Sequence, residues 1–128
     1  MIDHIDHIVL TTRDLQGCIR FYVEALGMKL ETFETPTEKR MALKFGRQKI
    51  NLHEWGREFT PRAHVAAPGT LDLCFIAAVP LDEVMRRLAA AGVTVIEGPV
   101  VKTGAVSKIR SVYVRDPDLN LVEISVPV

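Results

Sequence analysis

The sequence has no excess of charge, no long apolar run and very little cysteine, and each absence excludes a class of protein. Sixteen basic residues balance sixteen acidic residues over 128 positions. The chain therefore lacks the clustered positive charge that binds nucleic acid or anionic membranes. No segment approaches the roughly 20 apolar residues of a membrane-spanning helix. We expect neither a nucleic-acid partner nor a membrane partner.

The two cysteines, Cys18 and Cys74, are far apart and lie in apolar stretches. This spacing favours buried free thiols in a cytoplasmic protein over a disulfide or a two-cysteine metal site. The sequence starts Met-Ile-Asp-His, without the basic segment and apolar run of a signal peptide. We therefore expect a cytoplasmic location.

The sequence does contain an internal repeat. In the first half, a β-branched stretch at 5–12 precedes an amphipathic helix that Asp14 caps and Gly27 ends, followed by strand candidates near 28–34, 40–46 and 48–54. The second half repeats this order: a strand at 70–78, a helix that begins near Pro80 and ends at Gly92, and strand candidates near 93–97, 107–115 and 119–126. Residues 98–104 are predicted to form a loop that is longer than its first-half counterpart.

This order of elements predicts an α+β fold of two tandem βαβββ modules. We expect a single domain over residues 1–128, with module 1 at about 4–56, a linker at about 57–69 and module 2 at about 70–127. Each helix flanks one face of its curved sheet. The second copy can close over the other face and leave a cleft, where ligands commonly bind.

The repeat also relates two polar residues within apolar stretches. Gly27 and Gly92 end the two helices and are 65 residues apart, and the same offset relates His7 to Asp72. Both residues are of metal-ligand type. A lone histidine in a strand is more often a hydrogen-bonded core or edge residue, and Asp72 follows a turn that it could cap. The repeat favours a shared role over these separate ones.

A third candidate, Glu123, lies in the apolar final strand. Burying a carboxylate there without a partner costs several kcal/mol, which a metal, or a cross-strand pair with Arg110 or Arg115, removes. If the 98–104 loop adds about seven residues, Asn51 is the counterpart of Glu123 in module 1. A register error of two residues indicates His53 instead, on the same strand face.

One imidazole and two carboxylates, with an optional Asn or His, form a suitable set of ligands for a divalent metal. Mixed nitrogen and oxygen ligands suit Mn, Fe, Co, Ni or Zn better than Ca. Three protein ligands leave positions open for water or substrate. The residues therefore predict a catalytic metal site.

Three motifs resemble the vicinal oxygen chelate superfamily, which includes glyoxalases, bleomycin resistance proteins and extradiol dioxygenases. They are the opening Asp6-His7-Ile8-Val9-Leu10, the helix from Asp14-Leu15 through Phe21-Tyr22 to Leu26-Gly27-Met28, and the closing Asp116-Pro117-Asp118-Leu119-Asn120-Leu121-Val122-Glu123. Residues 49–54, 68–74 and 97–104 look most like the glyoxalase-domain-containing protein 5 group.

The resemblance implies paired βαβββ modules in a cup-shaped, barrel-like mixed sheet, a divalent metal ion (Ni, Zn, Mn or Fe) and a homodimer. It matches His7 and Glu123 to metal ligands directly. Asp72 stands where many members have His, and Asn51 stands where glyoxalase I has a ligand glutamate. The predicted metal ligands are therefore His7, Asp72, Glu123 and Asn51.

The resemblance also implies chemistry on a small molecule that chelates the metal through adjacent oxygens. We expect a lyase, isomerase or dioxygenase, with Glu123 as the catalytic base and His53 as a second candidate. The alternative is a metal-free protein that binds and sequesters a small molecule, with Trp55 and Phe59 beside the site.

Overall fold

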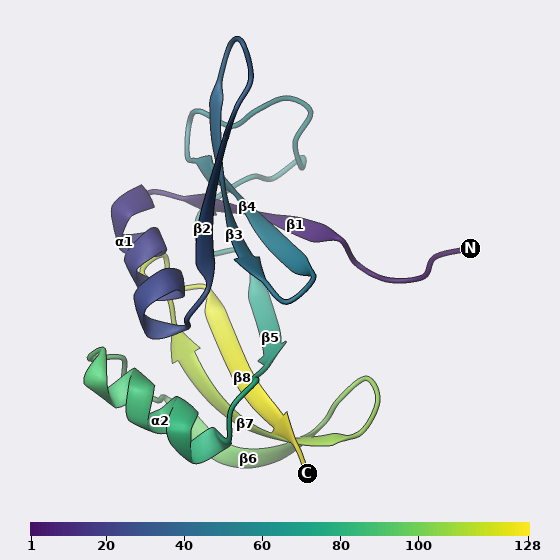
Figure 1. Ribbon diagram of the computed structural model, residues 1–128, viewed down its shortest axis with the longest axis vertical. Helices are drawn as coiled ribbons and strands as arrows, with labels where there is room; N and C mark the ends of the chain where they lie inside the picture. The colour runs from purple at the N-terminus through teal and green to yellow at the C-terminus, as the bar shows by residue number, and fades with distance from the viewer. The chain divides into compact units, whose positions relative to one another are not determined.

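The computed structural model describes residues 1–128, and the chain divides into two compact units, residues 1–70 and 71–128. Figure 1 colours the first from purple to teal and the second from teal to yellow. Each unit contains a helical segment and a four-stranded mixed sheet. Each is described below by itself.

Unit 1 begins with a strand and a helical segment. Its elements are β1 (His7–Thr12), α1 (Leu15–Ile19), η1 (Arg20–Ala25), β2 (Lys29–Glu34), β3 (Lys39–Phe45) and β4 (Gln48–Glu54). The sheet order is β1-β4-β3-β2, with β1 parallel to β4 and the other pairs antiparallel. The Asp14 carboxylate accepts a hydrogen bond of 3.0 Å from the Gly17 amide and caps the helix, as predicted.

Unit 2 repeats this order. Its elements are β5 (Asp72–Ile76), α2 (Leu81–Ala90), β6 (Glu97–Thr103), β7 (Lys108–Arg115) and β8 (Leu121–Pro127). The sheet order is β5-β8-β7-β6, and β5 is parallel to β8. Helix α2 contacts β8 and buries Leu81, Val84 and Leu88. No helix in the structure has the length and apolarity needed to cross a membrane.

The predicted α+β fold of two βαβββ modules is confirmed. Gly27 and Gly92 both have positive φ, +78° and +73°, where the helical segments end. The second half of the first helix is a π-helix, η1, which the sequence did not indicate. Two predictions in unit 2 are wrong: 93–97 is not a strand, and 98–104 is not a loop but most of strand β6. Gly98-Pro99 suggested a loop, but proline is tolerated on an edge strand, and β6 contains a register shift between Glu97 and Val100.

Each sheet has one apolar face and one polar face. The apolar face of the first sheet carries the buried Leu10, Leu43, Ile50 and Leu52, and that of the second carries Val112, Val114, Val122 and Ile124. Residues that pair across strands share a face. The polar face of sheet 1 therefore carries alternate residues of its four strands: His7, Val9, Thr11, Lys49, Asn51, His53, Arg40, Ala42, Lys44, Lys29, Glu31 and Phe33.

The polar face of sheet 2 is built by the same alternation. It carries Asp72, Cys74, Ile76, Leu121, Glu123, Ser125, Ser111, Tyr113 and Arg115. All the candidate site residues predicted from the sequence thus lie on the polar face of one sheet or the other.

Candidate functional site

The strand registers relate the candidate residues of the two modules. His7 lies opposite Lys49 in the parallel pair β1–β4, and Asp72 lies opposite Leu121 in the parallel pair β5–β8. Because His7 and Asp72 occupy equivalent positions, the residues two places beyond their partners are also equivalent. These are Asn51 and Glu123, 72 residues apart. The seven residues in excess of 65 are spread between Gly92 and Asn120 rather than contained in one loop.

Glu123 is held by hydroxyl groups from its own unit. The hydroxyl of Ser111, on the neighbouring strand β7, donates a hydrogen bond of 2.5 Å to Glu123 Oε2. The Ser125 hydroxyl lies 3.4 Å from the same oxygen and 2.7 Å from the Ser111 hydroxyl. Both serines are fully buried. The carboxylate therefore has a fixed orientation on the polar face of sheet 2.

Tyr113 and Cys74 complete this hydroxyl cluster. Both lie opposite Glu123, Tyr113 on β7 and Cys74 on β5. Burial, followed by hydrogen bonding to Glu123, raises the pKa of Tyr113 to about 12, so the phenol remains a proton donor at neutral pH. Partial desolvation of the thiol, followed by the negative charge of Glu123, raises the pKa of Cys74, whose Sγ lies 3.5 Å from the Ser125 hydroxyl. Cys74 is exposed, in contrast to the buried thiol expected, whereas Cys18 is buried as expected.

In module 1, by contrast, two buried polar atoms on the equivalent face lack hydrogen-bond partners. Asn51 Oδ1 is buried and has no hydrogen-bond partner, and the same is true of Nδ1 of His53. Both residues lie on β4, two positions apart, and therefore on one face. A buried polar atom without a partner typically costs about 1–3 kcal/mol. These two atoms therefore have hydrogen-bonding capacity that the protein itself does not satisfy.

His53 is enclosed by an aromatic ring and basic side chains. Its ring meets that of Phe59 edge to face, with centroids 5.2 Å apart, and the Arg40 guanidinium stacks 4.2 Å from the Phe59 centroid. His53 is 7% exposed. Burial, reinforced by the charge of Arg40, lowers the pKa of His53 below its ordinary value, which favours the neutral imidazole.

His7 and Asp72 are more accessible than the glutamate and the asparagine. The His7 side chain is 44% exposed, and its Nδ1 lies 2.8 Å from the Asp6 carboxylate. Asp72 is the exposed first residue of β5. The Asp6 carboxylate contacts Nδ1 of His7, so Nε2 is the ring nitrogen that a metal could bind.

The groups that surround Glu123 were not predicted from the sequence. Ser111 and Tyr113 alternate with buried valines on β7, a pattern that indicates a polar face, but the pairing of β7 with β8 decides which residue they meet. The suggested pairing of Glu123 with Arg110 or Arg115 is wrong. Arg110 alternates onto the opposite face, and Arg115 donates a hydrogen bond of 3.2 Å to the Leu119 carbonyl.

Comparison with known proteins identifies the family. The model of the Glyoxalase/Bleomycin resistance protein/Dioxygenase superfamily matches residues 4–124. The chain belongs to this superfamily. The family predicted from the three sequence motifs is therefore confirmed.

Two relatives share about half of their residues with this superfamily member. Virulence protein STM3117 of Salmonella typhimurium is 50% identical over 98% of this chain and 85% of its own length. Glyoxalase domain-containing protein RDO1 of Mycosarcoma maydis is 48% identical over 94% of this chain and 66% of its own length. The crystal structure of STM3117 matches with a TM-score of 0.94 over 100% of this chain and 99% of that chain.

More distant proteins of similar structure carry different functional names. Lactoylglutathione lyase from Agrobacterium tumefaciens is 25% identical, with a TM-score of 0.72 over 98% of this chain and 94% of that chain. TnmS3, an antibiotic-binding protein from Streptomyces sp. CB03234, is 24% identical, with a TM-score of 0.74 over 99% of this chain and 98% of that chain. TnmS3 shares the fold alone. Membership of the superfamily thus leaves both an enzyme and a binding protein open.

The donors of the candidate residues suit the divalent metal that is frequent in the superfamily. Each module offers one position at the edge strand, His7 or Asp72, and one on the neighbouring strand, Asn51 or Glu123. Asn51 Oδ1 lacks a partner, and the bonds to Glu123 are of the kind that orients a ligand carboxylate. No group of three or more His, Cys, Asp or Glu side chains lies close enough together to hold a metal.

Proposed function

We propose that this chain is a metal-dependent enzyme of the glyoxalase superfamily that acts on a small molecule with adjacent oxygen atoms. The proposed ligands are His7 and Asn51 from module 1 and Asp72 and Glu123 from module 2, and the ion is Ni, Zn, Mn or Fe. The observation that carries this proposal is the register equivalence of Asn51 and Glu123, each beside the equivalent pair His7 and Asp72. Imidazole, carboxylate and amide oxygen are a suitable donor set for these ions.

The protein's own residues supply orientation and proton transfer. When bound, the metal acts as a Lewis acid that polarises an oxygen of the substrate. Ser111, Ser125 and Tyr113 hold the Glu123 carboxylate in one orientation. Glu123 is the proposed catalytic base for proton abstraction next to a carbonyl, and neutral His53 is the second candidate. An isomerase or lyase would need this base.

Elemental analysis tests the proposal directly. The chain is purified without a histidine tag or chelator, together with His7→Ala and Glu123→Gln and the matched controls His4→Ala and Glu54→Gln. His4 is exposed near the N-terminus, and Glu54 is the exposed last residue of β4. We expect near-stoichiometric metal in the wild type and in both controls, and its loss in both site variants. No metal, even after incubation with each ion, would refute the metal-enzyme proposal.

The second candidate function is metal-free binding and sequestration of a small molecule. Trp55 favours it, because the residue is 58% exposed and the Arg13 guanidinium lies 5.7 Å from the ring centroid, as in a stacking surface. Glu123→Gln distinguishes the two functions. It abolishes the activity of a metal enzyme and leaves the binding of an apolar ligand largely intact.

The proposed assembly is a homodimer. Light scattering of the purified chain checks this independently of metal content, and a monomer at micromolar concentration would contradict it.

A further inference from the structure

A row of basic side chains crosses the whole polar face of sheet 1. His7 on β1 lies opposite Lys49 on β4, Lys49 lies opposite Lys44 on β3, and Lys44 lies opposite Lys29 on β2. Like charges directly opposite one another destabilise a sheet. Lys49, Lys44 and Lys29 are neighbours across three strands, and repulsion between them lowers the stability of the sheet. A role other than stability would explain why they stand there.

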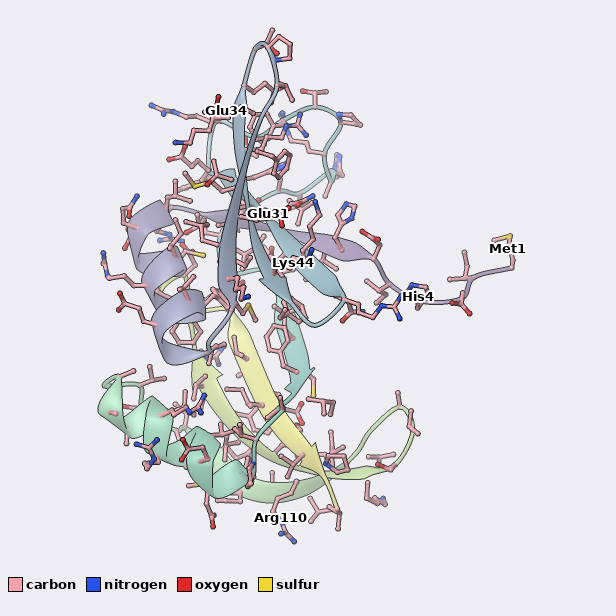
Figure 2. The ribbon with its side chains drawn as sticks, viewed as in Figure 1. Met1, His4, Glu31, Glu34, Lys44 and Arg110 are labelled. Atoms are coloured by element: carbon pink, nitrogen blue, oxygen red, sulfur yellow. The ribbon has the colours of Figure 1, made fainter.

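Negative charge compensates only part of this row: the pKa of Asp6 is lowered chiefly by its hydrogen bond with His7 and further by the charge of Lys49. Glu31 is the one acidic residue among those that the registers place there, and its carboxylate lies 3.9 Å from Lys44 Nζ; both are labelled in Figure 2. No carboxylate lies within 4 Å of the ammonium group of Lys49 or Lys29. The face thus carries a positive surplus in a chain whose formal net charge is zero.

The Lys49 ammonium makes no ion pair within 4 Å and lies against an aromatic ring of the same face. Its Nζ lies 5.0 Å from the centroid of the Phe33 ring on β2. Phe33 pairs with Arg40, whose guanidinium stacks on Phe59, and Phe59 contacts His53. The lysine therefore leans toward the end of the face where His53 lies, with its buried, unpartnered Nδ1.

Module 2 has no such arrangement at the equivalent positions. The counterpart of Lys49 is Leu121, and the counterpart of Lys44 is Arg115, which bonds to the Leu119 carbonyl. The basic row therefore does not follow from the fold that the two modules share. It is a property of module 1.

We propose that the polar face of sheet 1 binds the anionic group of the substrate, a carboxylate or a phosphate, through Lys44 and Lys49, while His53 Nδ1 hydrogen-bonds to the same molecule. The inference rests on the proposed function only in taking this molecule to be the substrate. Each ammonium supplies charge-assisted hydrogen bonds, which are among the strongest that a protein makes to a small anion. The substrate class is then a small anionic molecule that also offers oxygens for chelation.

Calorimetric titration of the metal-free protein tests this inference. Protein dialysed against a chelator and then freed of it is titrated at low ionic strength with two probes, malonate for carboxylates and inorganic phosphate for phosphates. The variants are Lys44→Gln and Lys49→Gln. Lys39→Gln is the matched control, because Lys39 is exposed at the start of the same strand β3 and alternates onto the other face.

We expect the wild type and Lys39→Gln to bind at least one probe with equal affinity, and Lys44→Gln and Lys49→Gln to bind it about tenfold more weakly or not at all. Preference for malonate assigns a carboxylate substrate, and preference for phosphate assigns a phosphorylated one. Absence of binding to both probes, or equal weakening by the Lys39 control, would overturn the inference.

Two further readouts separate this inference from the proposed function. The metal content of Lys44→Gln and Lys49→Gln should equal that of the wild type, because neither lysine is a ligand. Anion binding by a wild type that takes up no metal would refute the metal enzyme and leave the anion site standing. Metal binding without anion binding would refute the anion site and leave the metal enzyme standing.

Discussion

The two modules share a register but differ in how their polar groups are satisfied. In module 2, Glu123 accepts hydrogen bonds from residues of its own sheet. In module 1, the equivalent Asn51 has a buried oxygen without a partner, and lysines stand opposite one another. The comparison shows that module 2 holds a charged group in a fixed orientation within its own sheet, whereas module 1 leaves buried polar atoms without a partner.

The strongest way to break this comparison is to remove the carboxylate of module 2. Glu123→Met keeps the approximate shape of the side chain and deprives the buried hydroxyls of Ser111 and Ser125 of an acceptor. We expect the free energy of unfolding to fall by about 1–3 kcal/mol. Urea denaturation of the metal-free protein measures this. The exposed Glu54→Met should change little, and an equally stable Glu123→Met would show that the hydroxyl cluster does not depend on the carboxylate.

The turns before the last strand of each module give a second contrast. Module 1 has Gly46 at φ +52°, whereas module 2 has Leu119 at φ +67°. A side chain in this left-handed region costs about 1–2 kcal/mol. Leu119 is 67% exposed and loses little burial when it is replaced. We expect Leu119→Gly to raise the free energy of unfolding by about 0.5–1 kcal/mol, after allowance for the flexibility of glycine in the unfolded chain.

Thermal unfolding with two companion variants checks this prediction. Leu119→Ala keeps a Cβ and should gain almost nothing, and Gly46→Ala should lose about 1 kcal/mol. A gain from Leu119→Ala as large as that from Leu119→Gly would assign the effect to the exposed apolar side chain instead of the backbone.

Asn51 should respond with the opposite sign to Glu123. Asn51→Leu is close in shape and removes a buried polar group whose oxygen has no partner. We expect the metal-free protein to gain up to about 1 kcal/mol of stability, because that oxygen accepts no hydrogen bond that could be lost. Denaturation with and without added metal measures both effects. Destabilisation of the metal-free protein would contradict the picture of an unsatisfied module 1.

The basic row should carry a smaller cost in stability. Relief of repulsion between Lys44 and Lys49 in Lys49→Gln should stabilise the ligand-free protein by about 0.2–1 kcal/mol at low ionic strength. Added salt screens the repulsion and should reduce the gain. If Lys49→Gln gains stability and loses anion binding, Lys49 serves function at a cost in stability. An unchanged melting temperature at low salt would show that Lys44 and Lys49 do not repel each other measurably.

The smallest expected effect concerns Glu83, which lies on helix α2 and not on the polar face of sheet 2. Hydrogen bonds from Arg86 and Arg87 lower the pKa of Glu83 from 4.5 to about 2. Its contribution to stability is therefore present above pH 4.5 and is lost as the pH falls toward 2. We expect Glu83→Gln to be slightly less stable than the wild type at neutral pH and equal to it near pH 2. A difference that persists at pH 2 would mean that packing, and not charge, is responsible.

The sequence predicted the fold because its signals are local. Helical spacing of apolar residues, the Asp14 cap and the stops at Gly27 and Gly92 each act within a few residues, and the repeat doubled their weight. The assignment of 98–104 to a loop failed because Gly98-Pro99 is equally compatible with an edge strand that contains a bulge. A single sequence does not reveal which backbone groups remain unpaired.

The candidate site could be predicted only in part. Alternation along β4 showed that Asn51 and His53 share a face, and the repeat related His7 to Asp72. The contacts of Glu123 with Ser111 and Ser125 depend on the pairing of β7 with β8, and the basic row depends on three pairings at once. These cross-strand relations are set by turn lengths and bulges, which a single sequence leaves ambiguous.

The parallel pairing of first and last strands also has a consequence for how the protein is made. Strand β1 leaves the ribosome first, yet its partner β4 is the last strand of the module, and β5 and β8 repeat this relation. Each edge strand must wait for its whole module to be synthesised, and such sequence-distant pairings form slowly. The strands that carry His7 and Asp72 therefore find their partners only after the rest of their modules has been synthesised.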